Sequence, residues 1–433
     1  MDAAPAPSNP ATRTCPECHT TIPVEPGYVT WCDHCNWNLL PDDPGNRPGL
    51  IERLYVSLNE RLGKSLLDEI VRAPALRPRI TLAVVAGTAI AVLVHAVTLA
   101  FAAGGVFLIV WRWPNALLIG AGAILLLIAW LLRPRLGRAP AETVTRKDCP
   151  ALFRLVDAAA GALDAPHVDA IALGGGLEAA IAEVGWRRKR VLFLGVPLLE
   201  ALDGQERIAV LAHELAHAGS GDPRTNFAVV SALQSLDRWY NWLRPIGVPS
   251  TLRGVGGIAG IIVVLLNLLG LALSSIVWVI GFALAQLFWR NSQRAEYRAD
   301  ALSATVSGTR AVVSALDKGP VLPGALERAT ALVGHKREYG RLFDEFRRYA
   351  HNVPERECER LRRIYARFGT RLDPLHPPHD YRLQALRANP VLQAKVVWSS
   401  GEDEQLAREL APAQLKAAEA LVAQYRSRVY YWE

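Results

Sequence analysis

The motif His213-Glu214-x-x-His217 carries the residue types of a metal-dependent hydrolase. Residues four apart lie on one face of an α-helix, so both imidazoles can reach the same metal ion. Glu214 is too close in sequence to His213 to share that coordination, but it can act as a general base on a water at the metal. Asp203 and Glu206 form a capping-box pattern that predicts where this helix begins. The competing interpretation is a buried helix whose histidines only form hydrogen bonds.

A pair of carboxylates further along the chain predicts the third protein ligand. Glu296 and Asp300 are four residues apart and share one face of a predicted helix. Two neutral imidazoles and one carboxylate leave one position open on a zinc ion, which is typical of a catalytic site. We therefore expect Glu296 to bind zinc together with His213 and His217. Asp300 is expected to orient a ligand histidine by accepting its other ring N–H.

These motifs resemble those of the membrane metallopeptidases that include HtpX-type quality-control proteases and the CAAX prenyl proteases. The resemblance extends over roughly residues 140–390 and implies a mainly helical gluzincin domain with a small β-sheet. In that family the histidine of a His-Pro segment lies near the metal and stabilises the developing oxyanion, so His376 is expected to take this role. The matching residues are Leu211–His217 with Asp222, Glu296-Tyr297 with Ala299-Asp300, and Leu375–Pro378 with Arg382, Leu383 and Leu386.

One segment departs from the family's pattern. The family carries an Asn-Ala-Phe-like segment on the strand that lines the substrate groove, whereas the corresponding residues 174–180 here are Gly-Gly-Gly-Leu-Glu-Ala-Ala. The departure bears on substrate preference more than on catalysis. We expect a substrate to add as an extended strand beside residues 177–184, through main-chain hydrogen bonds.

Four cysteines near the N-terminus form two C-x-x-C pairs, Cys15 with Cys18 and Cys32 with Cys35. The spacing predicts a structural zinc site, because four thiolates close a tetrahedral coordination shell. Three alternatives are a haem-attachment motif ending at His19, two disulfides and a redox dithiol. The first two suit an oxidising compartment, and a single dithiol does not explain two pairs. We expect a zinc ribbon that either binds a partner or serves as a folding cap.

The composition indicates a membrane protein, since 51% of the residues are hydrophobic and 21% are charged. No charged residue occurs between Arg79 and Arg112 or between Arg112 and Arg133, which predicts two transmembrane helices. A third uncharged block covers residues 254–289 and is longer than one crossing of the about 30 Å hydrocarbon core requires. The predicted metal ligands flank this block yet must meet at one ion, so the block crosses an even number of times.

The preferred interpretation of this block is two short spans with a turn near residues 267–270, and the alternative is a re-entrant hairpin. About four transmembrane segments are therefore expected in a multi-pass protein of the cell membrane. Arginines cluster outside the first two spans, against Arg112 alone in the turn between them, so the N-terminus and the active site are expected to face the cytoplasm. The clustered arginines are Arg72, Arg77 and Arg79 before the first span and Arg133, Arg135 and Arg138 after the second.

The motifs and composition shifts predict the domain organisation. Short strands are expected at residues 168–173, 177–184 and 191–196, ahead of the motif helix. The expected units are a zinc ribbon (1–40), a linker and amphipathic helix (41–78), two transmembrane helices (79–133), the first part of the metallopeptidase domain (140–252), a transmembrane pair or re-entrant hairpin (254–289), the second part of the domain (290–390) and a C-terminal helical tail (391–433).

Together these features predict an α+β membrane protein that acts as a zinc-dependent endopeptidase, with one catalytic and one structural Zn²⁺. Its expected substrates are polypeptides, by family analogy misfolded or selected membrane proteins. The alternatives are a regulated protease for one dedicated signalling partner and a non-catalytic scaffold that recruits partners through the zinc ribbon. The net charge of +7 favours contact with anionic lipid headgroups of the bilayer, and nucleic-acid binding is not expected.

Overall fold

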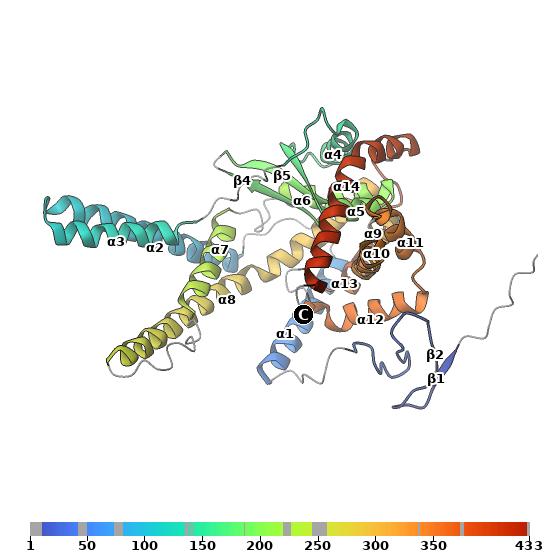
Figure 1. Ribbon diagram of the computed structural model, residues 1–433, viewed down its shortest axis with the longest axis horizontal. Coiled ribbons are helices and arrows are strands. Elements are labelled where there is room, and N and C mark those ends of the chain that lie inside the picture. Colours follow the sequence, from blue (N-terminus) through green and yellow to red (C-terminus); the bar gives the residue numbers. More distant parts are fainter. Residues whose placement is uncertain are drawn as a thin grey trace, which may run out of the picture.

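The structure, a computed structural model, is mostly helical, with one two-stranded and one three-stranded sheet. Figure 1 shows two pairs of long helices that extend away from a body containing the larger sheet, α2 (Leu82–Trp111) with α3 (Ala116–Leu132) and α7 (Phe227–Leu243) with α8 (Ile258–Ser307). The described residues are 11–41, 50–72, 81–134, 137, 140, 142–185, 187–219, 227–244, 258–336, 338–372 and 376–430. The predicted linker at residues 42–49 lies outside them, as do Arg77, Arg79, Arg135, Arg138, Asp222 and Leu375.

The larger sheet confirms the three predicted strands to within two residues at each end. Its strand order is β3-β5-β4, with β3 parallel to β5 and β4 antiparallel to β5 at the edge of the sheet. The strands are β3 (Ala170–Gly174), β4 (Ala179–Val184) and β5 (Lys189–Gly195). Ile171 of β3 and Leu192 and Leu194 of β5 are buried in the largest hydrophobic core, together with residues of the helices of the body.

The motif helix α6 (Gly204–Gly219) runs through this core. Leu211 and Leu215 are buried on its apolar face and pack with the helix α4 (Pro150–Ala162). Helix α6 also lies against the edge strand β4. Because the core fixes one face of α6, the side chains on its other faces have defined directions, including those of the motif.

The helices α2 (Leu82–Trp111) and α3 (Ala116–Leu132) form a hairpin. The side chain of Asn115 accepts hydrogen bonds from two N–H groups at the start of α3. Gly105 and Gly122 lie where the helices cross, and an added Cβ on either would be under 3 Å from the other's carbonyl oxygen. Helix α2 is long and apolar enough to cross a membrane, and α3 is a shorter apolar helix. The two apolar helices predicted in residues 79–133 are therefore present.

Helix α8 (Ile258–Ser307) is continuous, so the turn predicted near residues 267–270 is wrong. The residues that suggested a turn have other roles. The side-chain amide of Asn267 donates to a carbonyl one turn earlier in the same helix, at 3.0 Å, which satisfies it without a break. Gly270 lies against α7, where an added Cβ would be 2.7 Å from the carbonyl oxygen of Leu243. Close helix packing, rather than a turn, explains this glycine.

The partner of α8 is the preceding helix α7 (Phe227–Leu243), which lies beside it (Figure 1). Both interpretations of residues 254–289, a transmembrane pair and a re-entrant hairpin, placed a turn inside the block. The helix pair instead forms between α7 and α8. In the most apolar part of α8 only 6% of the residues are buried, so the described part of the protein leaves it uncovered. At 1.5 Å per residue α8 is about 75 Å long, and its second half enters the body of the protein.

The C-terminal helix α14 (Ser400–Tyr430) is part of the core rather than a separate tail. Leu406 and Leu410 are buried among the residues of α4 and α6. The carboxylate of Glu409 accepts hydrogen bonds from the first N–H groups of α4, which have no partner within that helix. The segment predicted as a helical tail thus packs against the helix that carries the motif.

The N-terminal module, residues 11–41, contains a hairpin of two three-residue strands and lies beside the helix α12. The remaining elements are β1 (Thr12–Thr14), β2 (Thr21–Pro23), α1 (Leu50–Arg72), α5 (Val196–Ala201), α9 (Thr309–Lys318), α10 (Leu322–Lys336), the 3-10 helix η2 (Tyr339–Arg341), α11 (Leu342–His351), α12 (Glu355–Leu372) and α13 (His379–Ala388).

Candidate functional site

The two motif histidines and Glu296 meet at one point between α6 and α8. The Nε2 atoms of His213 and His217 are 3.2 Å apart. Glu296 Oε1 lies 3.2 Å from Nε2 of His217, and Glu296 Oε2 lies 3.6 Å from Nε2 of His213. The glutamate side chain is fully buried, although it lies on the same helix as the exposed apolar segment. The continuity of α8 therefore places Glu296 at the histidines.

This donor set fits a zinc ion. Candidate ligand atoms of all three residues lie within 4.8 Å of one another. A tetrahedral zinc site with bonds of about 2.0–2.1 Å has ligand-to-ligand distances of about 3.3 Å. The separations between the nitrogen and oxygen atoms match that value. Two imidazoles and one carboxylate also leave a fourth position for a water or a substrate, as in catalytic zinc sites.

Asp300 contacts the first histidine, His213, from the side opposite the metal point, which is the place where the ligand atoms of His213, His217 and Glu296 meet. Its Oδ1 lies 2.9 Å from Nδ1 of His213, as expected for a carboxylate that orients a ligand imidazole. Arg382 of α13 donates to both oxygens of Asp300, at 2.8 Å from Nε and 2.6 Å from Nη2. In the sequence, Arg382 is matched to the family's motif that begins at Leu375, but no role is predicted for it there. Membership of that motif is the sequence feature that points to Arg382 as a site residue.

The electrostatics of α6 suit metal binding and proton transfer. Burial lowers the pKa of His213, but the carboxylates of Asp300 and Glu296 outweigh burial and raise that pKa to about 10. A metal ion must displace this proton, so metal binding is coupled to proton release. Burial raises the pKa of Glu214, with the neighbouring histidines opposing the shift. A carboxylate with a raised pKa is a stronger base when ionised, which suits a general base.

His376 lies at the rim of the site. Its Nε2 is 3.7 Å from Oε1 of Glu296, and its side chain is 40% exposed. It occupies the segment between the end of α12 at Leu372 and the start of α13 at His379. Every predicted catalytic or ligand residue around the motif therefore falls within one cluster. The remaining motif residues Asp222 and Leu375 lie outside the described residues.

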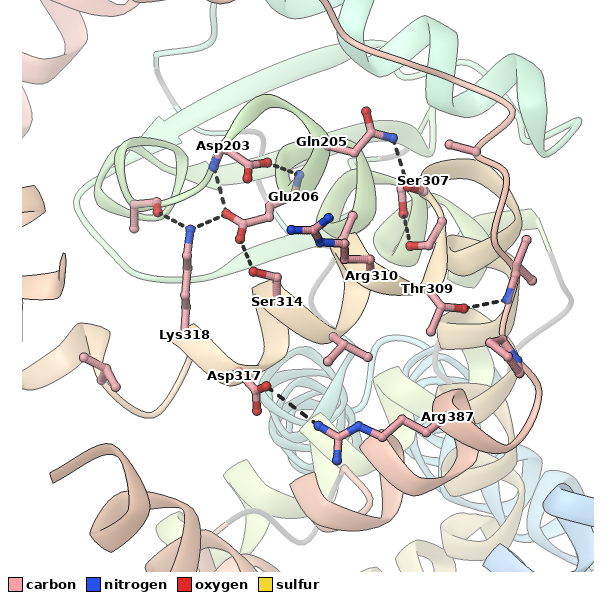
Figure 2. A pocket seen from close by; sticks show the side chains of 18 of the residues that line it. Asp203, Gln205, Glu206, Ser307, Thr309, Arg310, Ser314, Asp317, Lys318 and Arg387 are labelled. Atoms are coloured by element: carbon pink, nitrogen blue, oxygen red, sulfur yellow. Dashed lines mark hydrogen bonds and ion pairs between the residues drawn. The ribbon is translucent and has the colours of Figure 1, made fainter. Parts of the chain in front are cut away.

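The start of α6 is anchored through Glu206. The N–H of Asp203 donates to the Glu206 carboxylate and the N–H of Glu206 donates to Asp203, both at 2.8 Å, so the predicted capping box is confirmed. The same carboxylate accepts hydrogen bonds from Ser314 and Lys318 of α9 (Figure 2). These contacts tie the helix that carries the histidines to the helix that follows α8.

The anchor borders a cavity of about 1010 Å³ that is separate from the metal point. Its walls come from the start of α6, from α9 and from residues 390–397, and none of the predicted metal ligands lines it. Asp317 of α9 faces Arg387 of α13 across it (Figure 2). Asp317 also lies 3.7 Å from the ring of His379, at the start of α13. The cavity is therefore bordered by contacts that hold the helices around the site.

The four N-terminal cysteines form a second cluster of metal ligands. The sulfur of Cys15 is 3.6 Å from that of Cys35, and the sulfur of Cys18 is 3.5 Å from that of Cys32. All four sulfurs lie within 4.8 Å of one another. Tetrahedral zinc with bonds of about 2.3 Å to sulfur requires separations of about 3.8 Å, so the cluster fits a structural zinc ion.

Both cysteine pairs use the same turn. The N–H four residues after the first cysteine donates to that cysteine's carbonyl, and the first cysteine's N–H donates to the carbonyl five residues on. The residue after the second cysteine, His19 in one turn and Asn36 in the other, has a positive φ near 60°. The repeated turn directs two sulfurs from each half of the module to one point. In this structure all four cysteines are free thiols rather than disulfides.

Comparisons with known proteins agree with this geometry. Residues 154–389, more than half of the chain, match the profile of peptidase family M48. The chain is also 29% identical over 169 residues to a protein described as "Protease HtpX homolog" from Polaromonas naphthalenivorans (strain CJ2). That alignment covers 38% of this chain and 56% of the relative, so the chain spans little more than half of the relative's length. No solved structure matches.

The family match covers the sheet, the motif helix, Glu296 and the His-Pro segment, and it ends at residue 389, before α14. The three motifs that carry the resemblance, Leu211–His217, Glu296–Asp300 and Leu375–Pro378, all lie inside the matched residues. The predicted resemblance is therefore confirmed. The chain belongs to peptidase family M48, the HtpX-like metallopeptidases.

Proposed function

We propose that this protein is an integral-membrane zinc endopeptidase that cleaves misfolded or selected membrane proteins on the cytoplasmic side. The observation that carries the proposal is the cluster of His213, His217 and Glu296, with Asp300 behind the first histidine. This cluster holds three ligands with an open fourth position and places an ionisable glutamate next to the metal point. The wider substrate assignment rests on the family and on the membrane helices.

Each side chain has a distinct task in the proposed reaction. When bound, zinc supplies a Lewis acid that acidifies a water and polarises the scissile carbonyl. Glu214 takes the proton from the attacking water and then passes it to the leaving amine. His376 donates a hydrogen bond to the oxyanion that develops on the former carbonyl oxygen, a contribution of about 3 kcal/mol for a well-placed donor. Asp300 and Arg382 hold the ring of His213 in place.

The edge strand β4 supports recognition of an extended substrate. In the described part of the sheet β4 pairs with β5 alone, which would let a further strand add to its other edge. Helix α6 lies against β4, which brings this edge close to the metal ligands. Main-chain hydrogen bonds to an added strand depend weakly on sequence. Such recognition suits a protease for partly unfolded segments of many proteins.

The helix pairs support a membrane topology with the active site on the cytoplasmic side. Helix α7 leads away from the body, and α8, which is long and apolar enough to cross a bilayer, leads back to it, so His217 and Glu296 lie on the same side of that bilayer. Helices α2 and α3 form the other pair, which puts the N-terminal module on that side as well. Arg112 lies between α2 and α3, whereas Arg72 and Arg133 lie outside them, and this asymmetry favours a cytoplasmic location for both.

A trapping experiment tests the proposed function. The full-length Glu214→Gln protein should retain zinc and bind substrates without cleaving them, because the base is lost and no ligand is. Quantitative proteomics of membranes that contain either wild-type or Glu214→Gln protein should find the same proteins enriched on the variant and depleted by the wild type. A single enriched protein would favour a dedicated signalling substrate. No difference between the two membranes would refute proteolysis.

A further inference from the structure

The ribbon surface next to the cysteine knuckles is covered by the chain's own helix α12. Trp31 and Leu39 of the module are 1% and 4% exposed and pack against Ile364 of α12. The ring of Trp31 lies between two guanidinium groups, those of Arg356 and Arg363, each 5.0 Å from its centre. Arg356 and Arg363 are seven residues apart, which is about two helical turns, so they lie on one face of α12. The binding partner of this surface is thus inside the same chain.

Arginine side chains bind the backbone of the module at specific carbonyl groups. Arg356 donates to the carbonyl of Trp31, and Arg363 donates to the carbonyl of Asp33, so the two bonds flank the metal ligand Cys32. Arg360 donates to the carbonyl of Leu39 at 2.7 Å. Arg328 of α10 donates in the same way to Gly27. Backbone carbonyls take these directions only while the knuckle turns are formed.

The module depends on its metal for those turns. Its core consists of Ile22 and the cysteines themselves, with Trp37 beside them, and its strands are three residues long. So small a core cannot balance the entropy of ordering the chain. Metal binding is then the main source of folding free energy, as in other small zinc modules.

Helix α12 depends on the module in turn. Among its described side chains the buried ones are Glu357, Arg360 and Ile364, which lie at or next to the module. Elsewhere α12 packs on α13 and α1. The helix ends at Leu372, four residues before His376. On the other side of His376, α13 is held by the bonds between Arg382 and Asp300.

We propose that the cysteine module is an intramolecular brace that positions His376, so that metal at the four cysteines sets the turnover of a distant active site. The inference rests on the proposed proteolytic function. Metal at the cysteines folds the module, the module holds α12, and α12 fixes the near end of the segment that carries His376. Arg356 and Arg363 are positioning residues in this arrangement.

The test compares full-length proteins in detergent. The brace variant is Arg356→Gln with Arg363→Gln. The matched control is Arg362→Gln, on the same helix, whose side chain pairs with Glu355 and Glu359 of α12. We expect the brace variant to keep the zinc content of the wild type and its KM, to lose about tenfold to 100-fold in kcat, and to exchange amide hydrogens of α12 faster. The upper figure is the lower end of the loss of about 100-fold to 1,000-fold that is typical when an oxyanion donor is removed.

A double-mutant cycle with His376→Ala separates the brace from general damage. If the brace acts through His376, adding the brace substitutions to His376→Ala should lower kcat no further. Cys15→Ser with Cys18→Ser should reproduce the brace variant's exchange and kcat while the catalytic zinc remains. The brace would be overturned if its substitutions lowered kcat equally in the wild-type and His376→Ala proteins. It would also be overturned if amide hydrogen exchange in α12 stayed unchanged. Full activity of His376→Ala would instead refute the oxyanion role, and the exchange measurement would then decide the brace by itself.

Discussion

Arg382 and Asp300 form a two-point ion pair directly behind His213, a predicted metal ligand. Two nitrogens of the guanidinium donate to the two carboxylate oxygens, and Oδ1 of the same carboxylate lies 2.9 Å from Nδ1 of His213. The pair joins α13 to α8 and, through the histidine, to α6. It therefore orients the imidazole and also holds together the three helices that make the site.

The first prediction concerns this pair. Arg382→Gln should lower the affinity of the catalytic site for zinc by about 10-fold to 100-fold, as is typical when a group that orients a ligand histidine is lost. Competition with a chelator of known affinity measures the effect. Arg387→Gln, on the same helix with a 60% exposed side chain, is the control and should bind zinc as the wild type does. An unchanged affinity in Arg382→Gln would mean that Asp300 orients His213 without help.

The second prediction separates the base from the third ligand. Glu214→Gln should abolish peptide cleavage and keep the catalytic zinc, because an amide cannot accept the proton from water. Glu296→Ala should lose both cleavage and that zinc. Metal analysis of the purified variants, with cleavage of an unfolded protein as the activity assay, checks both statements. If Glu296→Ala kept its zinc, the third ligand would have to be another carboxylate, with Asp300 the nearest.

The third prediction concerns metal content. The wild-type protein should bind two zinc ions per chain, and Cys15→Ser with Cys18→Ser should bind one and show reduced but measurable cleavage. Cys149→Ser with Cys358→Ser is the control, since these two cysteines lie outside both clusters, and it should keep both ions. Finding one zinc in the intact protein would rule out the two-site assignment.

The fourth prediction tests the topology. A cysteine that replaces Ala116, at the start of α3, should react with a membrane-impermeant maleimide in intact cells. A cysteine that replaces Ser400, at the start of α14, should react only after the membrane is opened. The native cysteines are all on the proposed cytoplasmic side and should stay unlabelled in intact cells. Labelling of both positions, or of neither, in intact cells would contradict the proposed orientation.

The fifth prediction concerns Gly270, where α8 packs closely against α7 and the expected turn is absent. Gly270→Ala should lower the stability of the α7–α8 pair by about 1–3 kcal/mol, because its methyl group would meet a carbonyl oxygen of α7. In Gly281→Ala the nearest neighbouring atom would be 3.8 Å away, so this control should unfold at or above the wild-type temperature. Thermal unfolding in detergent compares the two. Equal unfolding temperatures would show that α7 and α8 do not pack closely at Gly270.

The sequence alone determined which residues form the candidate site. Spacing of three to four residues on a helix is a local property, so the pairing of His213 with His217 and of Glu296 with Asp300 on common faces followed from the order of the residues. Uncharged blocks likewise identified the apolar helices, because no charged residue interrupts them. The strands were predicted to within two residues for the same local reason.

Only the tertiary structure decided how these local elements combine. A glycine that ends a helix and a glycine that admits a neighbouring helix look the same in a sequence, and the position of α7 decided which one Gly270 is. Arg382 acquired a role because α13 brings it to Asp300, which lies 82 positions earlier in the chain. The placement of the cysteine module on α12 rests on arginine-to-carbonyl contacts across more than 300 positions. Backbone carbonyls are common to every residue, so no residue pattern can identify them as partners.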